Sequence, residues 1–387
     1  MREIAFNKIY LSGNEKDYIA DALNRGSISG DGFYTSKVSQ FLEEKFALKK
    51  VLMTTSATHA LEMAAQLLNL KEGDEVIMPS FTFSSTANAV IKEGARPIFA
   101  EIKADTFNLD PADFEAKITE RTKAVIPVHY AGISCEMDQI KEIAAENEIK
   151  IIEDAAHAVN SFYKGKAAGW LGDFGCYSFH GSKNFVSGEG GALIINSEQK
   201  ELLKKAEIIR EKGTNRSRFL RGEIDKYSWV GEGSSYLPSD ILMALLFAQL
   251  ENLDYITAQR KKIFDYYNQN LKEFLSQGFL ESIPKVPADR QSNYHIYYLK
   301  FKNKKIRDYL LKKLHQKGIE ATFHFQPLHS SPMGKKLGYQ KEDFKLTEEI
   351  AGSLLRLPIY PDLSQRDLEY IIAALRDIFS QLKQVGV

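Results

Sequence analysis

Seven short apolar runs alternate with longer helical patterns between residues 50 and 200. The runs occupy residues 51–56, 75–80, 96–102, 124–130, 149–155, 173–179 and 191–197. Several are apolar on both faces, which is typical of strands in a mainly parallel sheet that helices cover. Between the first two runs, Leu61, Ala64, Ala65 and Leu68 have the spacing of a helix stripe, and this helix is expected to end at Gly73. The alternation predicts a doubly wound α/β domain built on a large, mainly parallel, seven-stranded sheet.

The pattern changes after about residue 250. Helical periodicity covers 256–275, 306–319, 346–357 and 366–382, whereas 293–303 alternates like a strand and 321–328 reads as an extended run. We therefore expect a large domain over residues 1–250 and a smaller C-terminal α+β domain over 251–387. The polar, irregular segment 211–229 is expected to be a loop of the first domain.

The composition narrows the class of protein. Lys+Arg and Asp+Glu number 51 each, so the net charge is zero and the basic footprint of a nucleic-acid-binding protein is missing. Two cysteines, Cys135 and Cys176, provide no disulfide framework and favour a reducing compartment. No apolar run approaches a membrane span, and the first residues lack the apolar core of a signal peptide. We expect a cytoplasmic protein with no nucleic-acid partner and no membrane insertion.

Polar or reactive residues follow five of the predicted strands. They are the residues 54–56, Ser80, 129–130, 153–154 and, after the strand that ends at Phe179, His180 and Lys183. In open α/β sheets, ligands bind beyond the carboxyl ends of the strands. Several reactive side chains are therefore expected to meet at one rim of the sheet.

Lys183 lies in the segment SFHGSKNFVSGEGG (178–191), between a Ser/His pair and a glycine cluster. A loop lysine is usually solvated, but a partly desolvated one can act as a neutral amine that attacks a carbonyl. Pyridoxal phosphate (PLP) needs such a lysine, a carboxylate at the pyridine nitrogen, a flat side chain over the ring and N–H donors for the phosphate. The sequence offers a residue for each need. They are Lys183 for the amine, Asp154 for the carboxylate, Phe81 and Phe83 for the cover, and Ser56, Ala57 and Thr58 at a strand–helix junction for the phosphate, with Ser178 and the glycines 188–191 framing the lysine.

Each residue also has a plainer interpretation. Asp154 can be a turn carboxylate at a strand end, Ser56 and Thr58 can be N-caps, and the two phenylalanines can be core residues. The glycine cluster is a weak signal by itself. The order of these residues, each after a separate strand of one sheet, favours the cofactor site.

At this point the sequence resembles a known family. EDAAH (153–157) followed by the lysine segment is similar to the sugar-nucleotide aminotransferases of the DegT/DnrJ/EryC1/StrS family, and so are GDGFYT, VLMTTSATHALEMAA, HFQPLH and LRLPIYP. Within the family, the sequence most resembles the dTDP-4-amino-4,6-dideoxygalactose transaminases. The resemblance is found in the segments PVHYAGISCEMD, IIREKGTNRSRFLRGEIDKYSW and GSSYLPSD. Those enzymes aminate dTDP-4-keto-6-deoxy-D-glucose with L-glutamate for surface polysaccharide synthesis.

The resemblance implies a PLP-dependent transferase of fold type I (aspartate aminotransferase-like) that works as a homodimer with sites at the subunit interface. It implies residue roles at matching positions: Lys183 as the Schiff-base lysine, Asp154 at the pyridine nitrogen, His157 near the ring hydroxyl, Phe83 stacked on the ring, and Ala57, Thr58 and Ser178 at the phosphate. The chain departs from the family in three places. Ser235 replaces an Asn that reaches the phosphate from the partner subunit, Leu237 replaces an Arg, and Ala57 stands where close relatives have Cys.

Further polar residues are expected to contact substrate. His180 and Asn184 are candidates for substrate contact, and in HFQPLH the analogy with the family points to contact of His324 and His329 with sugar or phosphate. The irregular segment also contains four basic residues, which either bind the nucleotide diphosphate or belong to a solvated loop. They are Lys212, Arg216, Arg218 and Arg221. His324 and His329 have no third ligand at a suitable spacing, so no metal site is expected.

The expected reaction is a two-step transamination. L-Glutamate donates the amino group, the amine of Lys183 moves the proton, and dTDP-4-keto-6-deoxy-D-glucose leaves as dTDP-4-amino-4,6-dideoxy-D-galactose. A 3-keto or GDP/UDP-linked sugar aminotransferase and a non-catalytic regulatory homologue stay open as alternatives. Lys183 disfavours a sugar 3-dehydratase, since that subgroup has histidine there, and no G-x-G-x-x-G follows the first strand as a nicotinamide oxidoreductase would need.

Overall fold

The computed structural model describes residues 2–278 and 280–384. Its centre is a seven-stranded sheet with the order β1-β9-β8-β5-β4-β2-β3. The strands are β1 (Lys50–Thr54), β2 (Glu75–Pro79), β3 (Arg96–Ala100), β4 (Thr122–Val125), β5 (Lys150–Asp154), β8 (Phe174–Ser178) and β9 (Gly191–Ile195). Each of the seven predicted runs contains one of them. Only β9 runs against its neighbours within this sheet, so the predicted α/β fold with a mainly parallel sheet is confirmed.

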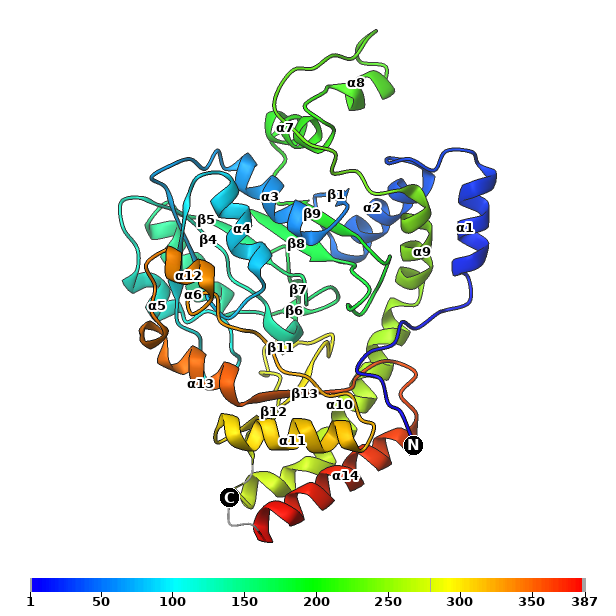
Figure 1. Cartoon of the computed structure of the whole chain (residues 1–387). Helices are drawn as coiled ribbons and strands as arrows, with labels where there is room; N and C mark the ends of the chain where they lie inside the picture. The colour runs from blue at the N-terminus through cyan, green and yellow to red at the C-terminus, as the bar shows by residue number, and fades with distance from the viewer. Residues whose placement is uncertain (1, 279, 385–387) are drawn as a thin grey trace.

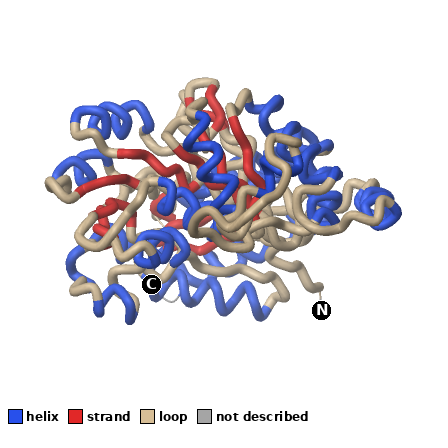
Figure 2. Tube along the Cα trace, turned by 90° about the horizontal axis from the view of Figure 1, so that it is seen from above, coloured by secondary structure: helices blue, strands red, loops and turns tan. Residues whose placement is uncertain are grey.

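Helices cover both faces of the sheet, and from above the strands lie inside a shell of helices (Figure 2). On one face, α3 (Ala57–Leu67), α4 (Ser84–Lys92) and α7 (Lys200–Arg210) share an apolar core with the strands. On the other face, α2 (Phe33–Phe46) and α9 (Asp240–Glu251) cover one half, and α5 (Pro111–Ala116) and α6 (Met137–Glu146) cover the other half. Burial on both faces explains why the middle positions of these strands are mostly apolar.

The first of these helices is shorter than predicted. α3 ends at Leu67 rather than at Gly73, because Asn69 takes a left-handed conformation with φ of 55°. The polar residues that follow form a separate turn, in which the Lys71 N–H donates to the carboxylate of Asp74 at 3.1 Å. A side-chain bond of this kind competes with helix continuation.

The C-terminal region forms a second core around the antiparallel sheet β10-β12-β13, at the bottom of Figure 1. The strands are β10 (Leu280–Ser282), β12 (Tyr297–Phe301) and β13 (Leu354–Leu357), and the helices packed on them are α10 (Leu253–Ser276), α11 (Lys304–Gln316) and α14 (Gln365–Gln384). The helix predicted over 346–357 is wrong in its last four residues. The helix α13 (Lys345–Ser353) ends before them, and these residues form β13 because they pair with β12.

Two segments cross between the cores. Ile4 packs in the C-terminal core and bridges to Ile319, although the predicted first domain begins at residue 1. In the opposite direction, the chain after Ala321 returns to the large domain, where the Leu328 N–H donates to the carbonyl of Ser80 at 2.9 Å. The predicted domain boundary at residue 250 lies close to the bend of 62° between α9 and α10.

The remaining elements are short or peripheral. They are α1 (Glu15–Asn24), the small sheet of β6 (Phe162–Tyr163), β7 (Lys166–Ala167) and β11 (Arg290–Gln291), α8 (Arg216–Leu220) and α12 (Pro332–Lys336). The predicted loop 211–229 contains α8 and projects from the large domain at the top of Figure 1. Within the described ranges, no single helix is long and apolar enough to cross a membrane; α9 and α10 meet that test only when they are taken together.

Candidate active site

A cavity of about 310 Å³ opens at the carboxyl ends of β5 and β8, beside the start of α3. Ten of the predicted site residues line it: Ser56, Ala57, Thr58, Phe83, Asp154, His157, Ser178, His180, Lys183 and His324. They come from segments as far apart in the sequence as the first strand–helix junction and the stretch before α12. The fold therefore brings most of the predicted chemistry into one space.

Lys183 lies in the loop between β8 and β9. Main-chain hydrogen bonds of 2.8 Å close this loop, from Phe179 N–H to the Gly190 carbonyl and from Gly181 N–H to the Gly188 carbonyl. Burial lowers the pKa of the Lys183 amine to about 8. Across residues 2–278 and 280–384, Nζ has no hydrogen-bond or ion-pair partner. The neutral form of this amine is thus far more accessible near physiological pH than that of an ordinary lysine, as a nucleophile or a proton carrier requires.

Asp154 is the last residue of β5 and its carboxylate faces the same cavity. The Thr86 hydroxyl donates to Oδ2 at 2.8 Å and the Ala156 N–H donates to Oδ1 at 3.2 Å. Burial raises the pKa of Asp154, whereas these two donors and the charge of Lys183 favour the ionised form. Asp154 is a buried acid that gains from a cationic partner in the cavity. Thr86 was not among the predicted site residues, although it is the last residue of the motif SFTFSST (80–86), which also contains Phe83.

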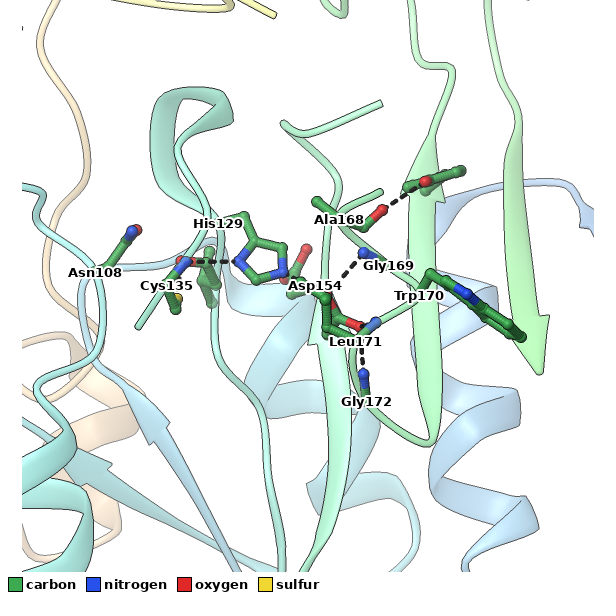
Figure 3. Close-up of polar contacts among 12 residues, drawn as sticks. Asn108, His129, Cys135, Asp154, Ala168, Gly169, Trp170, Leu171 and Gly172 are labelled. Atoms are coloured by element: carbon green, nitrogen blue, oxygen red, sulfur yellow. Dashed lines mark hydrogen bonds and ion pairs between the residues drawn. The ribbon is translucent and has the colours of Figure 1, made fainter. Parts of the chain in front are cut away.

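A buried hydrogen-bond network next to Asp154 holds the end of β5 in place (Figure 3). The carboxylate of Glu153 accepts the N–H groups of Gly169, Leu171 and Gly172 at 2.5–2.7 Å, and His129 Nε2 lies 2.7 Å from it. His129 Nδ1 accepts the Cys135 N–H at 3.1 Å, so the ring proton is on Nε2 and is donated to Glu153. The His129 N–H also donates to the Asp154 carbonyl at 3.1 Å. This network positions the main chain that carries Asp154.

The start of α3 forms the opposite end of the cavity. The Ser56 hydroxyl caps the helix by accepting the His59 N–H at 3.2 Å, which is the structural role open to it from sequence. The N–H groups of Ala57 and Thr58, in the first turn, have no partner within the helix and stand at the positive end of its dipole. The Thr58 hydroxyl lies 2.7 Å from that of Ser85, which also lines the cavity. This end of the cavity can hold a phosphate.

Two histidine rings stack on the side of the cavity that faces the C-terminal domain. The centroids of His157 and His324 are 5.9 Å apart with an interplanar angle of 13°, and the Tyr130 hydroxyl lies 3.2 Å from Nδ1 of His324. Burial, followed by nearby cations, lowers the pKa of both histidines well below the usual range. The Nδ1 atom of His157 is buried and has no hydrogen-bond partner among the described residues. A neutral polar atom is therefore available to a ligand.

Residues 10–376 of the sequence match the DegT/DnrJ/EryC1/StrS aminotransferase family. The chain belongs to this family. It is 33% identical over 370 residues to a GDP-perosamine synthase of Caulobacter vibrioides, with 95% of this chain and 96% of the relative covered. It is 36% identical over 355 residues to the spore coat polysaccharide biosynthesis protein SpsC of Bacillus subtilis, with 88% and 89% covered. Spr1654 from Streptococcus pneumoniae, solved in its PLP-form, superposes with a TM-score of 0.91 at 26% identity, covering 98% of this chain and 100% of the other.

The cofactor of this sugar aminotransferase is pyridoxal phosphate, and the cavity fits it. A lysine amine with a lowered pKa, a buried carboxylate and the start of a helix line one space, and His157 presents an unpartnered nitrogen to it. The side chain of Phe83 lines the cavity and is 63% exposed, which leaves it free to cover a flat ring. Phe81 does not line the cavity, since it is buried against Phe107, Tyr130 and Phe325.

The glycine cluster of the aminotransferase has a packing reason at Gly191. A Cβ atom there would lie 2.3 Å from the Ser56 carbonyl carbon and 2.4 Å from the Ala57 nitrogen. We predict that Gly191→Ala displaces the start of α3 and weakens PLP binding by about 10-fold or more, because the phosphate donors move. Cofactor titration of the two proteins, followed by absorbance, measures the effect.

Gly181→Ala is the matched control in the same loop. Its Cβ would meet only the Gly188 carbonyl oxygen, at 3.8 Å, so PLP affinity is expected to stay within about 2-fold of wild type. Equal PLP affinities for the wild type and both variants would contradict the close approach of Gly191 to the start of α3.

The lowered pKa of Lys183 predicts a distinct pH profile of reactivity. In the cofactor-free aminotransferase, acetylation of Lys183 by an amine-selective reagent should rise about tenfold per pH unit and level off above pH 8, where the neutral amine predominates. Lys164 is the comparison, because its exposed amine has a pKa raised by the Asp138 carboxylate. Its acetylation should still be rising at pH 9.5. Peptide mass spectrometry measures both rates, and parallel profiles would refute the prediction.

Five predicted site residues lie outside the cavity of the aminotransferase. Asn184 donates to the Asn293 carbonyl and accepts from His295 Nδ1, both at 2.8 Å, so it supports other residues of this chain, and its contact with substrate stays a prediction. His329 is buried 2.7 Å from the Ser80 hydroxyl, and its substrate contact likewise stays a prediction. Lys212 and Arg216 lie in the projecting segment 211–229, where Arg216 binds Glu211 at 2.5 Å. Ser235 lies beyond that segment and bridges to Glu211.

The other arginines of that segment are also occupied. Arg218 binds Glu223 at 3.1 Å, and Arg221 binds Glu207 at 2.9 Å and Glu223 at 2.6 Å. Of the two readings offered by the sequence, a grip on the nucleotide diphosphate and a solvated loop, these contacts favour the second within one chain. A role for Ser235 toward a partner subunit stays a prediction.

Proposed function

We propose that this aminotransferase transfers an amino group from L-glutamate to a nucleotide-linked keto sugar, with Lys183 and Asp154 as its catalytic residues. The observation that carries the proposal is the free amine of Lys183, with its pKa of about 8, in the same cavity as the buried carboxylate of Asp154. A regulatory binding protein would have no use for a basic and an acidic group that share one cavity and both have shifted pKa values.

Bound PLP supplies an electron sink for the carbanion that forms when the donor loses its α-proton. The amine of Lys183 takes that proton and returns it, and a pKa near the working pH suits both directions. Asp154, whose ionised form Thr86 favours, would pair with the pyridine nitrogen and keep it protonated. The start of α3 and the Ser178 hydroxyl would hold the phosphate, and His157 would serve the ring hydroxyl. These assignments are part of the proposal.

The first choice of acceptor is dTDP-4-keto-6-deoxy-D-glucose, with dTDP-4-amino-4,6-dideoxy-D-galactose as the product. Motifs such as PVHYAGISCEMD, which resemble the transaminases of that sugar, support it. A GDP-linked keto sugar is the second choice, since a relative that is 33% identical bears the name GDP-perosamine synthase. The name of SpsC supports a place in surface polysaccharide synthesis, and the two free buried cysteines support a cytoplasmic site for it.

The test is an incubation of the PLP-loaded enzyme with L-glutamate and either nucleotide sugar. Mass spectrometry detects the amino sugar and NMR assigns the aminated carbon. We expect the dTDP-linked substrate to react at least about 10-fold more efficiently than the GDP-linked one, a difference that one or two polar contacts can supply. A reversed preference would move the proposal to the GDP-linked sugar, and amination of neither would reject the keto-sugar acceptor.

We also propose a homodimer with the site at the subunit interface. Apolar side chains that have no cover within one chain gather on the projecting segment: Phe219, Leu220, Tyr227, Trp229 and Val230. Trp229 is 80% exposed, and exposed clusters of this kind mark protein interfaces. Light scattering should show a dimer for the wild type and a larger monomer fraction for Trp229→Glu. A monomeric wild type that is fully active would refute this arrangement.

A further inference from the structure

A second cavity, of about 150 Å³, adjoins the active-site cavity on the side of the C-terminal domain. Four residues line both cavities: His157, Ser182, Lys183 and His324. One wall of the smaller cavity comes from a segment that is distant in sequence from all of these, because Phe6 and Asn7 also line it. A small molecule that approaches the Lys183 amine from this side therefore meets residues 6 and 7.

The segment 4–12, which we call the strap, contains no helix and only an isolated β-bridge, yet it is held at both ends. At one end, the Ile4 N–H donates to the Gly318 carbonyl of the C-terminal domain at 2.8 Å. At the other end, the Gln249 side chain of α9 donates to the Tyr10 carbonyl at 2.8 Å. The strap thus connects the two domains, and Figure 1 shows it in dark blue between the label N and α1.

Phe6 lies between these two anchors and has contacts of its own. Its N–H donates to the Glu320 carboxylate at 2.8 Å, and the next residue, Asn7, donates through Nδ2 to the Gly181 carbonyl at 3.4 Å. Gly181 belongs to the loop that carries the active-site lysine. The ring of Phe6 lies toward the cavity, with the Arg356 guanidinium 4.8 Å from its centroid. The position of this ring is therefore tied both to the C-terminal domain and to the lysine loop.

Phe6 is the largest apolar side chain of the smaller cavity. The other apolar side chains in its lining are buried in the C-terminal domain; they are Ile296, Leu357 and Ile359. Phe6 is partly exposed and, within residues 2–278 and 280–384, it belongs to none of the apolar cores. Its ring is the wall of the cavity that borders solvent, so a smaller side chain at this position enlarges the cavity without opening a core.

We propose that Phe6 is a specificity-determining residue that limits the length of the amino-acid donor, an inference that rests on the proposed function. The donor has to bring its α-carbon to the Lys183 amine, which both cavities share. A cavity of about 150 Å³ is below the size that holds a drug-sized ligand, so it suits an amino acid rather than a sugar nucleotide. With Lys183 and Phe6 both in its lining, the space available to the donor side chain ends at the Phe6 ring.

The test uses donors that differ by one methylene: L-aspartate, L-glutamate and L-2-aminoadipate. Each is titrated into the PLP-loaded protein in the absence of sugar, and the absorbance of the bound cofactor reports the half-reaction. We expect the wild type to prefer L-glutamate over L-2-aminoadipate by about 10- to 200-fold, which is the discrimination that one methylene supports in a closed pocket. Phe6→Ala should reduce this preference by about 10-fold or more, because the enlarged cavity admits the longer side chain.

Phe6→Trp tests the same wall in the opposite direction. The larger ring should shorten the cavity and lower the efficiency of L-glutamate relative to L-aspartate by about 10-fold. Leu11→Ala is the matched control, since Leu11 lies in the strap, is 57% exposed and does not line the cavity. Its donor preferences should equal those of the wild type. The KM for the nucleotide sugar should stay close to the wild-type value in all three variants.

The ratios between donors separate this role from a purely structural one. A strap that only holds the domains together would change the efficiency of all donors by the same factor when Phe6 is replaced. Wild-type ratios in both Phe6→Ala and Phe6→Trp, or a wild type that does not distinguish L-glutamate from L-2-aminoadipate, would overturn the inference alone. A wild type that responds to none of the three amino acids would instead overturn the proposed donor, and the inference with it.

Discussion

Lys183→Ala is expected to lower turnover by about 10³-fold or more while the protein stays folded. The variant lacks the amine to which we assign the transfer of the α-proton, and general acid–base catalysis of this kind contributes about 10²- to 10⁴-fold. The assay is formation of the amino sugar from L-glutamate and the keto sugar nucleotide. Lys164→Ala, which removes an exposed lysine far from the cavity, should leave turnover unchanged.

The stability of this variant gives an independent check. Burial lowers the Lys183 pKa in the folded chain, so the unfolded chain binds more protons between pH 8 and the usual lysine value, and stability contributed by this group rises with pH over that window. Lys183→Ala loses this rise, and at pH 7 its cofactor-free form should melt at or above the wild-type temperature. A variant that retains full turnover, or an inactive one that is also unfolded, would not agree with the role proposed for Lys183.

Asp154→Asn is expected to weaken PLP binding by about 10- to 100-fold and to lower turnover by at least as much. The substitution keeps the shape of the side chain and removes the negative charge that faces the pyridine nitrogen, and a hydrogen bond to a charged group contributes about 1.5–3 kcal/mol. Equilibrium titration with PLP measures the affinity, and the amino-sugar assay measures turnover.

Two further variants help to interpret the result for Asp154→Asn. Thr86→Val removes the 2.8 Å donor to Asp154 and should raise the pKa of that carboxyl further, with a smaller loss of affinity that is partly recovered at higher pH. Asp138→Asn changes an exposed carboxylate paired with Lys164 and should have no effect. If Asp154→Asn binds PLP as tightly as wild type, the carboxylate does not contact the cofactor.

Much of the fold was predictable because its signals are local. The strands β2, β8 and β9 are short runs that are buried along their whole length, and the other strands of the large sheet are buried at most positions; such runs are mainly apolar whatever they pair with. Where a local pattern suits two structures, prediction failed. The residues of β13 continue the apolar spacing of α13 and read as helix, but pairing with β12 makes them a strand.

The candidate site also contains residues that were predictable from local sequence and residues whose contacts were not. Lys183, Asp154 and the start of α3 were predictable because each follows a strand, and parallel strands end at one edge of the sheet. Asn184 and His329 carry side chains suited to substrate contact, but Asn293, His295 and Ser80 already occupy them. Nothing in the local sequence reports such partners, since they are distant in the chain.

The order of strands and helices, the chemical types at the strand ends and the family of this chain were determined by the sequence alone, because they depend on residue type and spacing. The tertiary structure decided the burial that lowers the pKa of Lys183 and the Thr86 contact to Asp154. Solvation and pairing of a charged group depend on atoms from segments far apart in the chain, and only folding brings those segments together.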